Sequence, residues 1–282
     1  MLRDHRMLSP DADVPALEIS NATLRLTDGG PALFQQLNLK IAAGERVGIV
    51  GRTGSGKTSL VRLLNGLVQP ETGTVLINGM PIGAIPRSHM HRHVGTVFQQ
   101  PWLFSGTLRD NVSLGHNDLD DGALDQALQM AGLNNDHGDN LPLSMPIADQ
   151  GINLSGGQRQ AVSLARAFAF DPSIYLLDEP SSSLDTQFEN RLVTQITGRL
   201  AQQTFVIVTH KAQMLDLCTR IIVMNWGQIA KDMSIAEYKS SIAPAPPSKV
   251  TAAVNRRKPI MSQVQARPKP KPALTPKGSD ET

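Results

Sequence analysis

The sequence contains few cysteines and few aromatic residues. Its 282 residues include one cysteine, two tryptophans and two tyrosines. The single cysteine, Cys218, excludes an internal disulfide and is typical of proteins from a reducing compartment. No second element of a thiol enzyme is evident near Cys218, so we expect a small core residue there. The scarcity of aromatics argues against a stacking platform for single-stranded nucleic acid.

Long apolar runs are also missing. No uncharged apolar stretch approaches the roughly 18 residues that a membrane-spanning helix needs. The residues after Met1 are polar and lead into no apolar segment, so we expect no signal peptide. An apolar fraction of 40% and a charged fraction of 18% are typical of a soluble globular protein. The length allows one large domain or two small ones.

The end of the sequence differs in composition from the rest. Residues 241–282 carry eight basic residues against two acidic ones and eight of the 19 prolines, whereas residues 1–240 hold 19 basic and 23 acidic residues. Because residues 241–282 have almost no large apolar side chains, we predict a disordered tail there, and a disordered polar lead over residues 1–15. The tail either keeps the chain soluble, which composition favours, or contacts anionic lipid headgroups.

Residues 51–58 read G-x-x-x-x-G-K-T, between a β-branched apolar run at 46–50 and a helical pattern at 59–65. A strand, a glycine loop and a helix N-terminus in this order direct backbone N–H groups toward one place, where phosphate binds. Lys57 would reach the β- and γ-phosphates, and Thr58 would ligate Mg²⁺. A dinucleotide fingerprint does not fit, because no third glycine follows Gly56. The candidate nucleotide-binding residues of this loop are Gly51, Arg52, Thr53, Gly54, Ser55, Gly56, Lys57, Thr58 and Ser59.

Two further buried-strand patterns end in polar residues. Asp178 and Glu179 follow the apolar run at 173–177, and His210 follows the run at 205–209. In a parallel sheet, ligands bind at the carboxyl ends of the strands. Asp178 would therefore hold Mg²⁺, Glu179 would polarise the attacking water and His210 would reach a γ-phosphate. The alternative for the acidic pair is that it caps the next helix.

A helix beginning near residue 155 carries a second glycine pair. Ser155 and Gln158 fit a capping box, but Gly156 and Gly157 each cost about 1 kcal/mol relative to alanine inside a helix. Something is therefore expected to approach this backbone closely, and a second anion site fits. The predicted buried stripe runs through residues 161, 164, 165 and 168, with Arg166 outside it.

Other segments are less specific. His91 and His93 are spaced like metal ligands, but without a cysteine or acidic partner nearby they favour a solvated helix face over residues 87–93. Residues 105–153 alternate helical patterns with polar loops and interrupt the α/β alternation. A strand at 221–224 and a turn at 226–227 are predicted to close the folded part.

Together, residues 51–58, Gln99, residues 154–158, residues 178–179, residues 183–185 and His210 resemble the nucleotide-binding domain of ABC transporters over about residues 16–230. The resemblance implies an α/β fold, a P-loop NTPase core with an antiparallel β subdomain and an inserted helical subdomain. We expect the ATPase domain at 16–240 and its helical subdomain at about 105–168.

The resemblance also implies roles and partners. In this family two domains pair head to tail around ATP and Mg²⁺, so we expect a homodimer in the ATP-bound state. Gln99 resembles the residue that senses Mg²⁺ and couples to the membrane subunit, Glu179 the general base, His210 the γ-phosphate sensor and Asp185 the residue that links the two sites. The signature residues expected at the partner's ATP are Ser155, Gly156, Gly157 and Gln158.

Within the family, the run at 99–112 is similar to exporters, and Asp149-Gln150-Gly151 is similar to the exporter loop that touches the membrane domain. Gly51-Arg52 and the run at 160–162 are most similar to the ATPases of type I secretion systems. One departure is Leu26, which stands where the family usually has a tyrosine that stacks on adenine.

We therefore expect a Mg²⁺-dependent ATPase that powers an exporter of peptides or proteins. Since the sequence lacks membrane helices, we expect the transmembrane exporter subunit on another chain, with this chain cytoplasmic and peripheral at the inner face of the cell membrane. The chain could also be an excised domain or a relative that lost its transporter. The alternative function is an ATP-gated dimerising switch that regulates a partner without transport. A nucleic-acid-directed ATPase is disfavoured, since neither a second such domain nor a coiled-coil arm is present.

Overall fold

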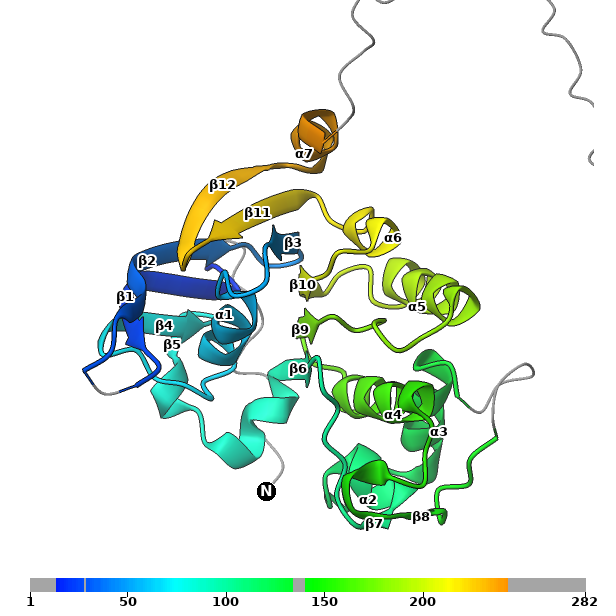
Figure 1. Ribbon diagram of the computed structural model, residues 1–282. Coiled ribbons are helices and arrows are strands. Elements are labelled where there is room, and N and C mark those ends of the chain that lie inside the picture. The colour runs from blue at the N-terminus through cyan, green and yellow to red at the C-terminus, as the bar shows by residue number, and fades with distance from the viewer. Residues whose placement is uncertain (1–13, 28, 134–139, 243–282) are drawn as a thin grey trace, which may run out of the picture. The chain divides into compact units, whose positions relative to one another are not determined.

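The computed structural model describes residues 14–27, 29–133 and 140–242 (Figure 1). The predicted lead and tail lie outside the described residues, except for residues 14–15 and 241–242. Among the described residues, no helix combines the length and the apolar character required to cross a membrane.

A six-stranded sheet forms the centre of the fold, in the order β12-β11-β3-β10-β9-β6. All neighbours are parallel except the edge pair β11 and β12. Every residue of β9 and β10 is buried, because both strands are covered on two faces and their sequences are almost continuously apolar. The carboxyl ends of the parallel strands therefore meet at one edge. The strands are β3 (Arg46–Gly51), β6 (Val94–Val97), β9 (Ile174–Asp178), β10 (Thr204–Val208), β11 (Arg220–Asn225) and β12 (Gln228–Ser234).

A second sheet is antiparallel, in the order β2-β1-β4-β5, and confirms the predicted antiparallel subdomain. Its apolar residues share one core with the helix α1 (Lys57–Leu64), which follows β3. That core fixes the start of α1 between the two sheets (Figure 1). The strands are β1 (Leu17–Arg25), β2 (Ala32–Ile41), β4 (Thr72–Ile77) and β5 (Met80–Pro81).

A mainly helical segment lies between β6 and β9 in the chain. Its helices pack together below the sheet edge in Figure 1, and their apolar residues belong to a second core. The segment also holds a two-stranded ladder of β7 and β8. Its elements are β7 (Gly106–Thr107), α2 (Leu108–Ser113), α3 (Asp121–Met130), β8 (Pro146–Ile147), η3 (Asp149–Gly151) and α4 (Gly156–Phe168).

The helix α4 buries the stripe predicted for it, but Arg166 is not on a solvated face. Its Nε donates to the backbone oxygen of Asn111 at 2.8 Å, and its Nη1 donates to that of Trp102 at 2.9 Å. Burial lowers the pKa of the guanidinium to about 10. Arg166 thus joins α4 to one carbonyl of α2 and one of the loop before it, and helical periodicity does not report such long-range contacts.

Several histidines and the cysteine are packed against other side chains. The His91 ring, on η2 (Arg87–Arg92) after η1 (Ile82–Ala84), lies 4.4 Å from His116 and 4.1 Å from Phe170. Burial, with nearby positive charge, lowers its pKa to about 4 and also lowers that of His93. The predicted solvated face is therefore wrong for His91. No group of three metal-ligating side chains occurs among the described residues. Cys218 is a core residue as predicted, and burial raises its pKa to about 12.

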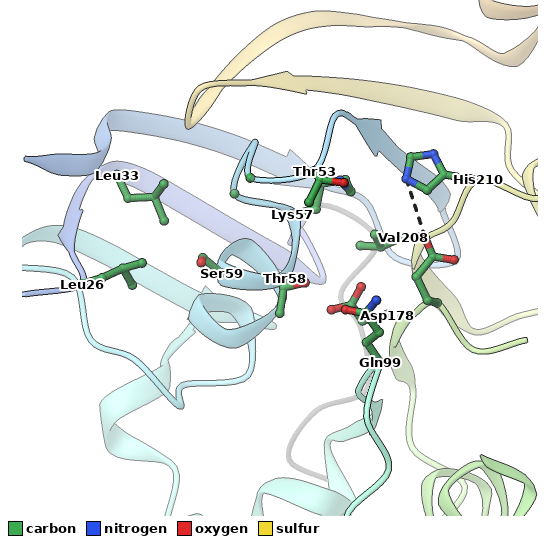
Figure 2. A pocket seen from close by; sticks show the side chains of 13 residues that line it. Leu26, Leu33, Thr53, Lys57, Thr58, Ser59, Gln99, Asp178, Val208 and His210 are labelled. Atoms are coloured by element: carbon green, nitrogen blue, oxygen red, sulfur yellow. Dashed lines mark ion pairs between the residues drawn. The ribbon is translucent and has the colours of Figure 1, made fainter. Parts of the chain in front are cut away.

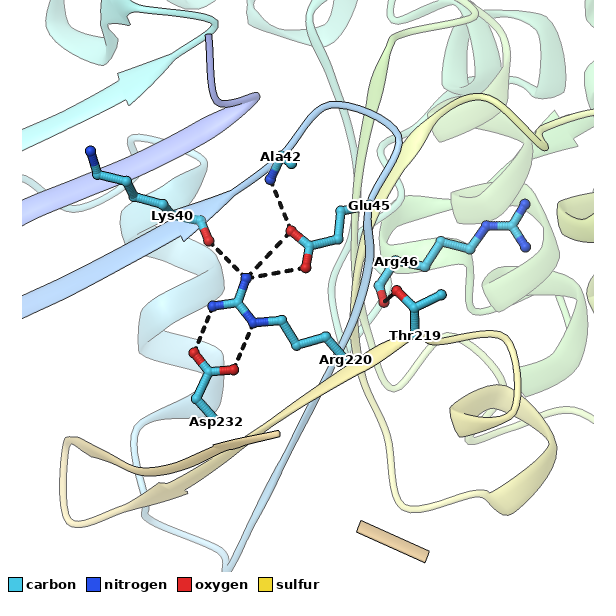
Figure 3. Close-up of polar contacts among 7 residues, drawn as sticks. All are labelled: Lys40, Ala42, Glu45, Arg46, Thr219, Arg220 and Asp232. Atoms are coloured by element: carbon cyan, nitrogen blue, oxygen red, sulfur yellow. Dashed lines mark hydrogen bonds and ion pairs between the residues drawn. The ribbon is translucent and has the colours of Figure 1, made fainter. Parts of the chain in front are cut away.

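The fold continues beyond the turn at 226–227, where the sequence pattern ended it. β12 pairs with β11, and α7 (Ile235–Ile242) follows. Figure 3 shows why a mostly exposed, polar strand stays paired: Arg220 binds Asp232 through Nε and Nη2, both at 2.6 Å, and Glu45 through Nη1 at 3.1 Å. The other C-terminal elements are α5 (Thr186–Gly198) and α6 (Ala212–Leu215).

Candidate functional site

A pocket of about 350 Å³ opens at the carboxyl edge of the parallel sheet (Figure 2). Side chains from the ends of β6, β9 and β10, from the start of α1 and from the antiparallel sheet surround it. The residues that line it are Leu26, Leu33, Thr53, Gly54, Gly56, Lys57, Thr58, Ser59, Gln99, Asp178, Glu179, Val208 and His210. It therefore gathers most of the phosphate loop with all three predicted catalytic residues, while Gly51, Arg52 and Ser55 lie in the loop without lining the pocket.

The backbone of the phosphate loop needs glycine at three positions. Gly54 and Gly56 have φ values of 80° and 100°, a left-handed conformation that glycine adopts without strain. A Cβ at Gly51 would come within 2.3 Å of the backbone oxygen of Met224. Gly56 also precedes α1 as its N-cap and offers no side chain to the helix N–H groups. The loop thus presents uncapped backbone donors to the pocket, which is the arrangement that binds phosphate.

The Lys57 ammonium lies over its own loop. Its Nζ donates to the backbone oxygens of Gly51 at 2.8 Å and Arg52 at 3.0 Å. Both acceptors are uncharged, and a phosphate oxygen is the stronger acceptor for an ammonium. Lys57 is therefore available to turn toward an anion in the pocket.

Asp178 ends β9 and is only 1% exposed. Within the described residues, its Oδ2 has no hydrogen-bond partner. Burial raises the pKa of its carboxyl, and the Thr58 hydroxyl and the charge of Lys57 act against that rise. A buried, unpartnered carboxylate oxygen beside the hydroxyl of Thr58 fits Mg²⁺, which prefers such hard oxygen ligands. These two residues, with the side chain of Gln99, could hold the ion.

Glu179 and His210 lie next to each other in the lining of the pocket. Glu179 Oε1 lies 3.7 Å from His210 Nε2 (Figure 2). Glu179 has a φ of 50° and its N–H donates to the Val208 oxygen at 2.8 Å, so the adjacent strand holds a conformation that is uncommon for a residue with a side chain. Burial raises the pKa of Glu179, the charge of His210 lowers it and that of Asp178 raises it further. A carboxylate with a raised pKa is the better general base near neutral pH.

Gln99 borders two cavities. It follows β6 and lines both this pocket and a groove of about 820 Å³ that is bordered by α1, the loop after β6 and the region of η3 and α4. Two large apolar side chains of that groove are exposed, Trp102 at 64% and Ile152 at 77%. Gln99, like Thr58, lines both cavities.

The signature residues lie outside the pocket. Ser155 and Gln158 form the predicted capping box, with Ser155 Oγ accepting from Gln158 N at 3.1 Å. A Cβ at Gly156 would find nothing closer than 3.9 Å and one at Gly157 nothing closer than 3.5 Å, and neither has a positive φ. Nothing within the described residues therefore requires these glycines. Asp185 is equally separate: it caps α5 by accepting from Phe188 N at 2.7 Å.

Sequence patterns did not single out Leu33, Val208 or Lys211. Leu33 and Val208 line the pocket, and Lys211 is the residue after His210. Leu33 and Val208 are ordinary apolar residues of the strands β2 and β10, so nothing in the sequence marks them as functional. Leu26, in contrast, lies at the pocket and is 60% exposed.

Comparison with known protein families identifies the family to which this chain belongs. The sequence profile described as "ABC transporter" matches residues 34–182. The chain belongs to the ABC transporter family. ATP binding and ATP hydrolysis are implied by that membership, and the predicted P-loop NTPase fold is confirmed.

Similar proteins include several exporters. The chain is 38% identical over 229 residues to the ATP-dependent lipid A-core flippase of Neisseria gonorrhoeae, covering 80% of this chain and 37% of that protein. It is 33% identical over 220 residues to the alpha-hemolysin translocation ATP-binding protein HlyB of Escherichia coli O157:H7, covering 77% and 31%. A solved bacterial Atm1-family ABC exporter with ATP bound has a TM-score of 0.74 and 26% identity, over 82% of this chain and 41% of that one. The chain spans only about a third of the length of these curated relatives.

Proposed function

We propose that this chain is the Mg²⁺-dependent ATP-hydrolysing part of an ABC exporter. The observation that carries the proposal is the single pocket in which the phosphate loop meets Asp178, Glu179 and His210. A protein that binds nucleotide without hydrolysing it would need the phosphate loop. It would not need beside it a glutamate, Glu179, with a strained backbone conformation and a raised carboxyl pKa.

The residues of the pocket suit an in-line attack of water on the γ-phosphate. Glu179 would hold the attacking water and accept its proton, and His210 would bind the γ-phosphate from the next strand. Lys57 would exchange its two loop carbonyls for phosphate oxygens. A Mg²⁺ ion held by Thr58, Asp178 and Gln99 would neutralise phosphate charge.

The active unit is proposed to be a homodimer with ATP between the chains. Ser155, Gly156 and Gly157 lie outside the pocket at an accessible helix start, and no described residue fills the space beside the two glycines. Two glycines without an internal reason indicate close approach of a ligand or a second chain. Pairing two chains head to tail would bring this helix start to the partner's γ-phosphate, with Gln158 and Asp185 beside it.

The groove next to Gln99 is proposed to receive a transmembrane exporter subunit on another polypeptide. Its exposed Trp102 and Ile152 offer apolar anchors, which is the usual chemistry of the centre of a protein interface. This chain would then lie peripherally at the cytoplasmic face of the membrane. Relatives named for alpha-hemolysin translocation and for cyclolysin secretion suggest a peptide or protein substrate.

The first test is ATP hydrolysis by the purified chain as a function of its own concentration, with Glu179→Gln as the blank. We expect activity per chain to rise with concentration and to vanish in the blank and when Mg²⁺ is chelated. Binding of ATP without hydrolysis at any concentration would contradict the proposal and indicate an ATP-gated switch.

The membrane partner needs a separate test. Ile152→Asp should abolish co-sedimentation with inside-out membrane vesicles from cells in which the protein is native, while its solution ATPase rate stays at the wild-type value. Equal sedimentation of wild type and variant would show that this groove is not the docking surface.

A further inference from the structure

The turn that carries Glu179 is held in place by a lysine outside the predicted site. Lys211 directly follows His210, and its Nζ donates to the backbone oxygen of Ser181 at 2.7 Å. The same Nζ lies 2.6 Å from Oε2 of Glu189 on α5. One ammonium therefore joins the residue after His210, the turn after Glu179 and the first part of α5.

The groups that accept from the Lys211 ammonium are buried, unlike those of an ion pair on the protein surface. The side chain of Glu189 is only 7% exposed, and Ser181 is buried. A buried carboxylate next to an ammonium that also satisfies a buried carbonyl leaves little freedom to either group. The ion pair of Lys239 with Asp216 differs, because both of its side chains are more than half exposed.

The contact acts on the same turn whose conformation is strained. Glu179 has a φ of 50°, and its carbonyl accepts from Ser182 N at 3.2 Å. The next carbonyl, of Pro180, accepts from the buried amide of Gln160 at 3.2 Å. The strained residue is thus followed by two consecutive carbonyls that are each held by a side chain from another element.

We propose that Lys211 is a positioning residue for ATP hydrolysis, which keeps the carboxylate of Glu179 and the ring of His210 at their observed separation. This inference rests on the proposed ATPase function. Lys211 does not line the pocket, so it acts through Glu179 and His210 and not on ATP. By linking both to Glu189, one helical turn after Asp185, it also ties them to the start of α5.

The test compares kcat and KM for ATP in the full chain for Lys211→Met, Lys211→Arg and Lys239→Met. Since small misplacements of reacting groups cost up to about 100-fold in rate, Lys211→Met should lower kcat about tenfold or more while KM stays within about threefold. Lys211→Arg keeps a donor for both oxygens and should recover most of kcat. Lys239→Met removes a surface lysine and should match wild type.

A second variant separates positioning from folding. Lys211→Met leaves the Glu189 charge buried without its partner, which alone destabilises a protein strongly, whereas an apolar replacement of both members of a pair is often neutral. Lys211→Met combined with Glu189→Leu should therefore regain the wild-type melting temperature but keep the low kcat. If the double variant also regained kcat, the positioning role would be overturned.

The measurements also distinguish a failure of the proposed ATPase function from a failure of the positioning role of Lys211. A wild-type chain without activity above the Glu179→Gln blank would overturn the proposed function and this inference with it. An active wild type with a Lys211→Met variant of equal kcat would overturn this inference alone.

Discussion

The signature glycine Gly157 gives a sharp prediction, because stability and activity should change in opposite directions. Gly157 is the second residue of α4, has no positive φ, and a Cβ there would make only ordinary contacts, the closest at 3.5 Å to the Ser183 oxygen. Alanine favours a helix over glycine by about 0.5–1 kcal/mol. Gly157→Ala should therefore raise the melting temperature by about 1–4 °C in a domain of this size.

The same methyl group should damage function. If a γ-phosphate of a second chain approaches this backbone, the Cβ would displace a contact with a charged group, which is worth about 1.5–3 kcal/mol. We expect the ATPase rate of Gly157→Ala to fall about tenfold or more. In a Glu179→Gln background, we also expect ATP to stop producing a dimer in size-exclusion chromatography.

The matched control is Gly122→Ala. Gly122 is the second residue of α3, and its added Cβ would lie 3.4 Å from Asp120 Oδ1. It should gain similar stability and keep wild-type activity and dimerisation. If Gly157→Ala kept both activity and dimerisation, no ligand would require glycine at this position.

Three further predictions concern the pocket. Leu26→Tyr should tighten ATP binding about fivefold, because a stacked aromatic contributes about 1 kcal/mol; an unchanged affinity in an ATP titration would contradict this. Asp178→Asn should abolish hydrolysis and raise the melting temperature at neutral pH, since the raised carboxyl pKa means that ionisation opposes folding. That gain should shrink as the pH falls toward the ordinary value of 3.8, where both states are protonated. Finally, because Glu179 must be ionised to act as a base, kcat/KM should fall with decreasing pH around a midpoint above 4.5; a midpoint at or below that value would contradict the raised pKa.

The elements that sequence predicted well are those whose burial is continuous. β9 and β10 are apolar throughout, and the glycine spacing at 51–58 follows from the backbone path that a phosphate loop requires. The positions of Asp178 and His210 then follow from topology, since parallel neighbours end at one edge. For these residues, local pattern and tertiary position carry the same information.

The remaining features depend on polar pairs between distant parts of the chain. β12 is a largely exposed strand held partly by Arg220 and Asp232, so it shows little apolar alternation. Lys211 and Glu189 are separated by 22 residues, and neither has a sequence signal that points to the other. Hydrophobic periodicity reports which face of an element is buried, but not which charged side chain will find a partner there.

Two acidic residues of the pocket, Asp178 and Glu179, reduce the stability of the folded chain. Burial disfavours the ionised forms of Asp178 and Glu179, and Glu179 adopts a strained φ. A bound cation beside Asp178 would remove part of this penalty, so Mg²⁺ with nucleotide should stabilise the folded chain by an amount set by its affinity. The Lys211 contact has the opposite character, because it is satisfied within the chain before any ligand binds. The Lys211 contact therefore fixes the positions of Glu179 and His210 before any ligand binds. The unfavourable burial of the Asp178 and Glu179 charges, in contrast, is offset only when the ligand binds.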